Sequence, residues 1–167
     1  MANVSEVITP ALAKAIDQWV NKFPEGQQKS AVLMALRIVQ KEYGWLEQKH
    51  MDAVSEYLKI AKIDVYEVAS FYSLYQHKEV GKHLVKVCTS LSCCLNGAYQ
   101  VVEHFEQELG VKCGETTSDG QITLQETECL AACADAPMLC VDDKDYHLNL
   151  TPQNISELIK TLREEKV

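Results

Sequence analysis

The fold is decided by the segment at residues 84–110, which reads LVKVCTSLSCCLNGAYQVVEHFEQELG. Leu84–Val87 is a short apolar run, which predicts a buried strand that ends at Cys88. From Gly97 to Leu109 apolar residues recur at helical spacing, and Gly110 is a typical helix stop. A strand, a turn that contains cysteines and a helix in this order predict the first part of a βαβ unit.

The residues that follow complete an α/β domain. Ile122–Gln125 alternates apolar and polar residues, as a half-buried strand does. Met138–Val141 and Tyr146–Leu150 are expected to pair as a hairpin around the acidic turn Asp142–Asp145. Thr151-Pro152 supplies an N-cap and a first-turn proline for a closing helix. The resulting order, βαβ followed by ββα, is that of a thioredoxin-like domain with a right-handed parallel crossover.

The segment before this domain is expected to be a small helical bundle. Its apolar periodicity predicts four helices, which start near Pro10, Gln27, Met51 and Asp64. Thr9 is the expected N-cap of the first helix, which continues to Phe23. Asp64 and Glu67 have the spacing of a capping box for the fourth helix.

Four aromatic side chains of this segment are expected to pack in its core: Trp19, Trp45, Phe71 and Tyr72. The segment contains no clustered cysteines, no glycine-rich loop and no carboxylate pair typical of a catalytic site. We therefore expect it to serve as a docking domain.

Composition excludes several classes of protein. With 167 residues, 47% hydrophobic and 24% charged, the chain is an ordinary globular protein of one or two domains. The net charge of −8 argues against a nucleic-acid binder, because such binding requires basic side chains that neutralise phosphates. No apolar run reaches the roughly 18–20 residues that span a bilayer. The start, MANVSEVITP, lacks the features of a signal peptide, so we expect an intracellular protein.

Cysteine and charge are distributed unevenly along the chain. All seven cysteines follow residue 87. Residues 1–81 carry 9 basic and 10 acidic side chains, whereas residues 82–167 carry 7 and 14. We therefore expect two domains, a helical docking domain at 1–81 and a thioredoxin-like domain at 82–167.

Four of the cysteines have a spacing that suits an inorganic cofactor. Cys88 and Cys93 form C-x4-C in the first strand–helix turn, and Cys129 and Cys133 form C-x3-C after the second strand. Both loops follow the carboxyl ends of neighbouring parallel strands, so the four thiols are expected to converge. Soft thiolates suit a [2Fe–2S] cluster or zinc, and buried or reactive thiols are a third alternative. The C-x4-C loop favours the cluster, because zinc sites mostly use tighter knuckles.

The remaining cysteines and the histidines receive simpler interpretations. Cys140 is expected to be a small apolar side chain in a core strand, and Cys113 an incidental loop residue. Cys94 adjoins Cys93 and could replace it as a ligand. The five histidines are scattered, so we expect them on the surface: His50, His77, His83, His104 and His147.

The sequence resembles the NuoE-type subunit of respiratory complex I, a thioredoxin-like [2Fe–2S] ferredoxin. The matching stretches are EYGWLE (42–47), VASFYSLY (68–75), VGKHLVKVCTSLSC (80–93), GETTSDGQITL (114–124), ECLAACADAPM (128–138) and NLTPQNISELI (149–159). The resemblance implies that Cys88, Cys93, Cys129 and Cys133 bind one [2Fe–2S] cluster, and it favours Cys93 over Cys94. The family often has glycine where Ala131 stands, which could tighten the second loop.

The resemblance also implies a function. The chain would be the one-electron carrier subunit of NADH:quinone oxidoreductase and would not act on NADH alone. FMN and NADH would be bound by a partner, the NuoF-type subunit, within the larger peripheral arm of complex I. The expected location is the cytoplasm, peripheral to the inner face of the cell membrane and without membrane insertion. The alternative is the equivalent diaphorase subunit of an NAD-reducing hydrogenase or an NAD-dependent formate dehydrogenase.

Two further expectations concern the surroundings of the thiols. The acidic side chains Glu126, Glu128 and Asp135 should disfavour an added electron and lower the midpoint potential. Backbone N–H groups at the start of the helix after Gly97 should point toward the sulfurs and oppose this effect. Thioredoxin-like folds commonly carry a cis-proline before the third strand, so we expect a cis Ala136–Pro137 bond.

Overall fold

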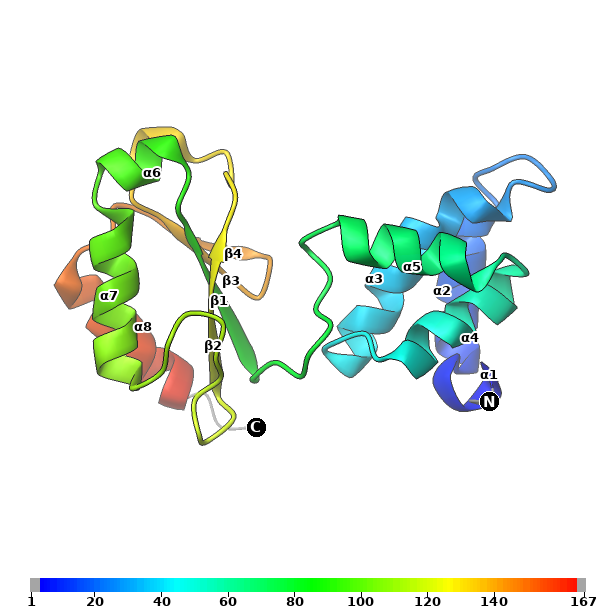
Figure 1. Cartoon of the computed structure of the whole chain (residues 1–167), viewed down its shortest axis with the longest axis horizontal. Coiled ribbons are helices and arrows are strands. Elements are labelled where there is room, and N and C mark those ends of the chain that lie inside the picture. The colour runs from blue at the N-terminus through cyan, green and yellow to red at the C-terminus, as the bar shows by residue number, and fades with distance from the viewer. Residues whose placement is uncertain (1–3, 165–167) are drawn as a thin grey trace. The chain divides into compact units, whose positions relative to one another are not determined.

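The computed structural model describes residues 4–164 of the chain. The chain folds as two compact units, Met1–Glu79 and Val80–Val167 (Figure 1). The predicted roles of the two segments, docking at 1–81 and cluster binding at 82–167, stay predictions at this point.

Unit 1 is a helical bundle, as the apolar periodicity predicts. Its elements are α1 (Val4–Val7), α2 (Pro10–Val20), the 3-10 helix η1 (Gln28–Ala31), α3 (Val32–Tyr43), α4 (Gln48–Leu58) and α5 (Lys62–Phe71). Thr9 caps α2 as expected, with its side-chain oxygen 3.3 Å from the Leu12 N atom. The core consists of fully buried aliphatic side chains from α2 to α5, among them Ile16, Leu36, Val39, Val54 and Val65.

Three predictions for unit 1 are wrong. Helix α2 ends at Val20 rather than Phe23, because the chain continues there in tight turns of i→i+3 hydrogen bonds. Asp64 is not an N-cap: α5 begins at Lys62, and the Asp64 carboxylate pairs with Lys29 at 2.6 Å. The aromatic pair at the end of α5 does not pack in the core, since Phe71 is 79% exposed and Tyr72 is 38% exposed.

His50 has a structural role in unit 1 that its isolated position in the sequence does not indicate. The residue is 2% exposed, so the expectation of a surface histidine is wrong. Its Nδ1 atom lies 3.1 Å from the Glu47 N–H and completes a capping box at the start of α4. The ring stacks on Tyr43 with centroids 4.4 Å apart. Burial lowers the pKa of His50, so the neutral ring is favoured in the folded unit.

Unit 2 contains a four-stranded sheet and three helices among the described residues. Its elements are β1 (His83–Cys88), α6 (Leu91–Leu95), α7 (Ala98–Leu109), β2 (Ile122–Thr127), the 3-10 helix η2 (Cys133–Asp135), β3 (Leu139–Val141), β4 (Asp145–His147) and α8 (Pro152–Glu164). The strand order is β2-β1-β3-β4. Strands β1 and β2 are parallel, whereas β3 and β4 add on antiparallel. This is the predicted βαβ-ββα order, and the α+β fold class is confirmed.

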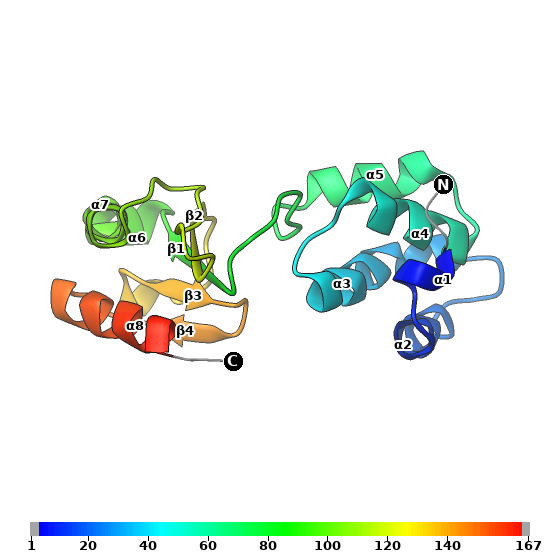
Figure 2. The ribbon, with the colours of Figure 1, turned by 90° about the horizontal axis from the view of Figure 1, so that it is seen from below.

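Both long helices of unit 2 cover the same face of the sheet (Figure 2). Alternate strand residues such as Val85, Val87 and Leu124 pack there against Phe105 of α7 and Ile159 of α8. Because strand side chains alternate between faces, Leu84, Lys86 and Cys88 belong to the other face. The helices therefore leave the strand end at Cys88 accessible to the loops that follow β1 and β2.

Charged pairs join β1 to the turn between β3 and β4. Asp142 and Asp143 both have positive φ, 53° and 58°, which suits the tight hairpin predicted for this acidic segment. The buried Lys86 ammonium lies 2.8 Å from the Asp143 carboxylate, and His83 Nδ1 lies 3.0 Å from Asp142. His83 is 5% exposed, so the expectation of a surface position is wrong for this histidine as well.

Among residues 4–164, no helix combines the length and the apolar character needed to cross a bilayer.

The environment of His50 predicts a pH dependence of the stability of unit 1. The folded pKa lies below the unfolded value of about 6.5, so the unfolded chain binds the proton first as the pH falls. The free energy of unfolding should therefore decrease as the pH falls from about 6.5 through the folded pKa. Both tryptophans, Trp19 and Trp45, lie in unit 1, so urea unfolding followed by their fluorescence measures this unit.

His50→Gln is the matched control, because glutamine keeps an acceptor for the Glu47 N–H but does not titrate. The variant should lose the part of the pH dependence that lies between about pH 5 and 7. The same slope in both proteins would contradict the role of the neutral ring.

Candidate iron–sulfur site

The parallel pairing of β1 and β2 brings the two cysteine-bearing loops to one edge of the sheet. Cys88 is the last residue of β1 and pairs in register with Thr127, the last residue of β2. Cys93 lies on α6 directly after β1, and Cys129 and Cys133 lie in the loop directly after β2. Figure 1 shows α6 beside this second loop. Two loops that are about 40 residues apart in sequence therefore meet, as the strand order predicts.

The four thiols are arranged as two pairs. The sulfur atoms of Cys129 and Cys133 are 3.5 Å apart. The thiols of Cys88 and Cys93 hydrogen-bond to each other. The pairs also influence each other, because a negative charge on Cys133 raises the pKa of Cys93.

The pairs differ in exposure to solvent. Cys88 and Cys93 are each 2% exposed and pack with Ala98 and Met138 in a small apolar cluster. Cys129 and Cys133 are exposed. A group held by all four thiols would therefore have one buried end and one end at the surface.

Backbone N–H groups support negative charge on the sulfurs. Burial alone would raise the pKa of Cys88, but N–H groups of Ser90 and Leu130 donate to its sulfur and lower the pKa overall. The Met138 N–H donates to Cys93, although burial and the contact with Cys88 still raise the pKa of Cys93 to about 11. At the exposed pair, the Ala131 N–H lies 3.4 Å from the Cys129 sulfur.

These donors differ from the expected ones. The sequence predicts donors in the first turn of the helix after Gly97, whereas the N–H groups that contact sulfur belong to Ser90, Leu130, Met138 and Ala131. Backbone donors leave no mark in the sequence, because every residue except proline has an N–H group. Helix α6, which carries Cys93, was also not predicted, because a helix of five residues has no visible apolar periodicity.

Ala131 has a conformation that glycine adopts more easily. Its φ of 64° lies in the left-handed region, which costs roughly 1–2 kcal/mol for a residue with a Cβ atom. This conformation turns the Ala131 N–H toward Cys129. The strained turn thus lies inside the second cysteine loop, where the family resemblance often has glycine.

The donor set fits a [2Fe–2S] cluster. Each iron of such a cluster takes two thiolates, and the structure offers one buried pair and one exposed pair. Among the described residues, no group of three or more His, Cys, Asp or Glu side chains is arranged around a single metal ion. The pairwise arrangement and the N–H groups directed at sulfur therefore suit two bridged irons better than one zinc ion.

The other cysteines lie apart from these contacts. Cys140 is buried in β3, as predicted, and Cys113 is half-buried beside the Leu124 carbonyl. Burial raises the pKa of both thiols. Cys94 is half-buried on α6, next to Cys93. The Ala136–Pro137 peptide bond, which follows the second cysteine loop, is cis as predicted.

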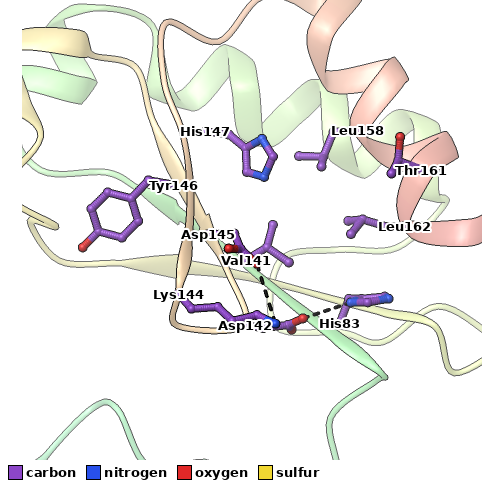
Figure 3. A pocket seen from close by; sticks show the side chains of 10 residues that line it. All are labelled: His83, Val141, Asp142, Lys144, Asp145, Tyr146, His147, Leu158, Thr161 and Leu162. Atoms are coloured by element: carbon purple, nitrogen blue, oxygen red, sulfur yellow. Dashed lines mark hydrogen bonds and ion pairs between the residues drawn. The ribbon is translucent and has the colours of Figure 1, made fainter. Parts of the chain in front are cut away.

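A pocket of about 520 Å³ lies away from the cysteines, between the β3–β4 hairpin and α8 (Figure 3). His83, the first residue of β1, lines it, whereas Cys88 is the last residue of that strand. None of the seven cysteines is among its lining residues. The pocket is therefore not part of the candidate site.

The fold and the paired thiols together define a thioredoxin-like iron–sulfur protein. Comparison with known proteins agrees: the family model of the thioredoxin-like [2Fe–2S] ferredoxins matches residues 16–163. The chain belongs to the thioredoxin-like [2Fe–2S] ferredoxin family, whose cofactor is a [2Fe–2S] cluster.

Two curated relatives and one solved structure illustrate the similarity. An NADH-quinone oxidoreductase subunit of the NuoE type from Rickettsia felis is 38% identical over 141 residues, which are 84% of either chain. The mitochondrial NADH dehydrogenase [ubiquinone] flavoprotein 2 of Dictyostelium discoideum is 35% identical over 90% of this chain, which spans only 61% of that relative. An NAD⁺-reducing [NiFe]-hydrogenase contains a similar fold, with a TM-score of 0.72 at 17% identity over 87% of this chain and 25% of that one.

The acidic surroundings of the second loop predict a change of redox potential. Glu128 is exposed and adjoins Cys129. A unit charge about 8 Å away at an effective dielectric of about 20 interacts by roughly 2 kcal/mol, and solvent screening reduces this to tens of millivolts for one electron. Glu128→Gln should therefore raise the midpoint potential at low ionic strength, and less so at high ionic strength. Potentiometric titration followed by absorbance measures both.

Glu157→Gln is a suitable control, because Glu157 is an acidic residue on α8, outside both cysteine loops. Its substitution should leave the potential nearly unchanged. A midpoint in Glu128→Gln that is equal to or lower than that of the wild type would contradict the electrostatic account.

Proposed function

We propose that the chain is the one-electron carrier subunit of an NADH:quinone oxidoreductase. In this role it exchanges electrons with the FMN of a partner subunit that binds NADH, the NuoF-type subunit of respiratory complex I. The single observation that carries the proposal is the meeting of two thiol pairs at one sheet edge of a thioredoxin-like unit. The Rickettsia felis relative, which bears the name of an NADH-quinone oxidoreductase subunit, supports the choice of complex.

Cys88, Cys93, Cys129 and Cys133 are the proposed ligands. When bound, the cluster supplies a centre that takes up and releases one electron at a time. Cys88 and Cys93 hold one end away from water, where their apolar neighbours limit solvent access. Cys129 and Cys133 hold the other end at the surface, where an electron can enter and leave. The N–H groups of Ser90 and Leu130 stabilise negative charge at Cys88.

The partner is required by the chemistry of NADH, which gives up a hydride rather than single electrons. The sequence contains no G-x-G-x-x-G fingerprint and no segment to which a flavin site can be assigned. A flavin on the partner converts the hydride into single electrons, and this chain then accepts them.

Exposed apolar side chains beside the thiols support docking of a partner at this edge. Leu91 is 76% exposed, Leu95 is 79% exposed, and both belong to α6 with Cys93 between them. Tyr99, at the start of α7, continues this row at the next helical spacing. Apolar groups that a free protein leaves in water are typical of a surface that another protein covers.

Unit 1 offers a second apolar surface. Phe71 and Tyr72 pack edge to face with ring centroids 5.0 Å apart, and both remain exposed. Large aromatic side chains frequently dominate the free energy of binding at interfaces. We infer that this pair contributes to holding the FMN-binding subunit, in keeping with the docking role expected for residues 1–81.

The alternative complex has weaker support. The hydrogenase structure is only 17% identical, so its similarity concerns the fold alone. The relatives with 35–38% identity carry complex I names. We therefore place the chain in the peripheral arm of complex I, at the cytoplasmic side of the cell membrane.

The test of this function is reduction of the protein by NADH with and without its partner. Purified chain should keep its visible absorbance when NADH is added alone and lose it when the FMN-binding subunit of the same organism is also present. Reduction by NADH without the partner, or no reduction in the complex, would contradict the proposal.

The same assay tests the aromatic surface of unit 1. Phe71→Ser should raise the partner concentration needed for half-maximal reduction about tenfold, which corresponds to roughly 1.4 kcal/mol of binding. Phe71→Tyr keeps the aromatic ring and is the matched control, with binding close to wild type. Equal binding by the serine variant would remove Phe71 from the interface.

A further inference from the structure

The loop that carries Cys129 and Cys133 is exposed, yet other elements of unit 2 hold it in place. Of its residues, Leu130 packs toward the buried cluster of Cys88, Cys93 and Met138. The cysteine side chains of this loop are exposed, so apolar burial contributes little to their position. Specific hydrogen bonds must therefore supply most of the order that a cofactor with fixed Fe–S distances requires.

The first of these bonds comes from α6. Ser92 donates its hydroxyl hydrogen to the Cys133 carbonyl oxygen at 3.1 Å. Ser92 directly precedes Cys93. One hydrogen bond therefore links the neighbour of a buried thiol to the backbone of an exposed one.

The second bond comes from β4. Tyr146 donates its hydroxyl hydrogen to the Leu130 carbonyl oxygen at 3.2 Å. Figure 3 shows the Tyr146 ring on the opposite side of β4 from His147, away from the pocket. The Leu130 N–H in turn donates to the Cys88 sulfur. Leu130 is thus held through both of its backbone polar groups.

We propose that the hydroxyl groups of Ser92 and Tyr146 are positioning groups for the cluster. They hold the exposed cysteine loop against α6 and the buried thiols and thereby keep the two thiol pairs at the separation that the cluster needs. The inference deepens the proposed function and rests on its assignment of the four ligands. Neither hydroxyl touches a sulfur atom in these contacts, so both act through the backbone of the loop.

The experiment removes each hydroxyl with little change of shape. Ser92→Ala and Tyr146→Phe are made singly and together, and Ser92→Thr restores a hydroxyl at the first position. The controls are Ser156→Ala, which removes a hydroxyl bond to Glu108 on the helical face, and Tyr99→Phe, which alters an exposed tyrosine of α7. The readouts are the rate at which visible absorbance is lost to an iron chelator and the electron paramagnetic resonance spectrum of the reduced protein.

Each single variant should lose its cluster about fivefold faster than the wild type, and the double variant faster still. Fivefold is the effect of one hydrogen bond of ordinary net strength. The spectrum of the reduced protein should change in both single variants and return to the wild-type form in Ser92→Thr. Wild-type rates and spectra in Ser92→Ala and Tyr146→Phe, or equal effects in the two controls, would overturn the proposal.

A measurement on the protein without iron separates this inference from the proposed function. Amide hydrogen exchange at residues 129–135 should be faster in Ser92→Ala and Tyr146→Phe than in the wild type, because the bonds exist without a cofactor. Unchanged exchange would overturn the positioning role. A wild-type protein that binds no iron would instead contradict the proposed function, whatever the exchange rates are.

Discussion

The parallel pairing of β1 with β2 is the constraint on which the rest of the structure depends. It sets Cys88 opposite Thr127, so the segments that leave the two strands start side by side. The intervening helix α7 returns the chain across the sheet and packs Phe105 into the core. Without this crossover the two cysteine loops would be separate surface loops, and no four-thiol site would exist.

The position of the site at a sheet edge explains its asymmetry. Cys88 and Cys93 belong to a strand end and a short helix that pack on the apolar interior, whereas Cys129 and Cys133 belong to a loop with little to pack against. An electron carrier needs both properties, since burial protects the inorganic core and exposure allows transfer to a partner. The exposed Leu91 and Leu95 next to this edge complete a surface suited to close approach of another protein.

Much of this arrangement could be predicted from the sequence. Helix and strand periods, the Thr9-Pro10 and Thr151-Pro152 helix starts and the cysteine spacing are local signals, and they led to the correct element order. Whether a side chain is buried depends on distant residues. The exposure of Phe71 and the burial of His50 and His83 were therefore missed. The backbone donors to sulfur were missed because they depend on loop conformation rather than on residue type.

The most direct test of the central claim is the iron and acid-labile sulfide content of the anaerobically purified chain. The account predicts two irons and two sulfides per chain, a number that follows from the [2Fe–2S] composition. Cys94→Ser and Cys113→Ser should retain this content, whereas Cys88→Ser, Cys93→Ser, Cys129→Ser and Cys133→Ser should each reduce it or make the cluster labile. A colourless wild-type protein with zinc in place of iron and sulfide would contradict the account.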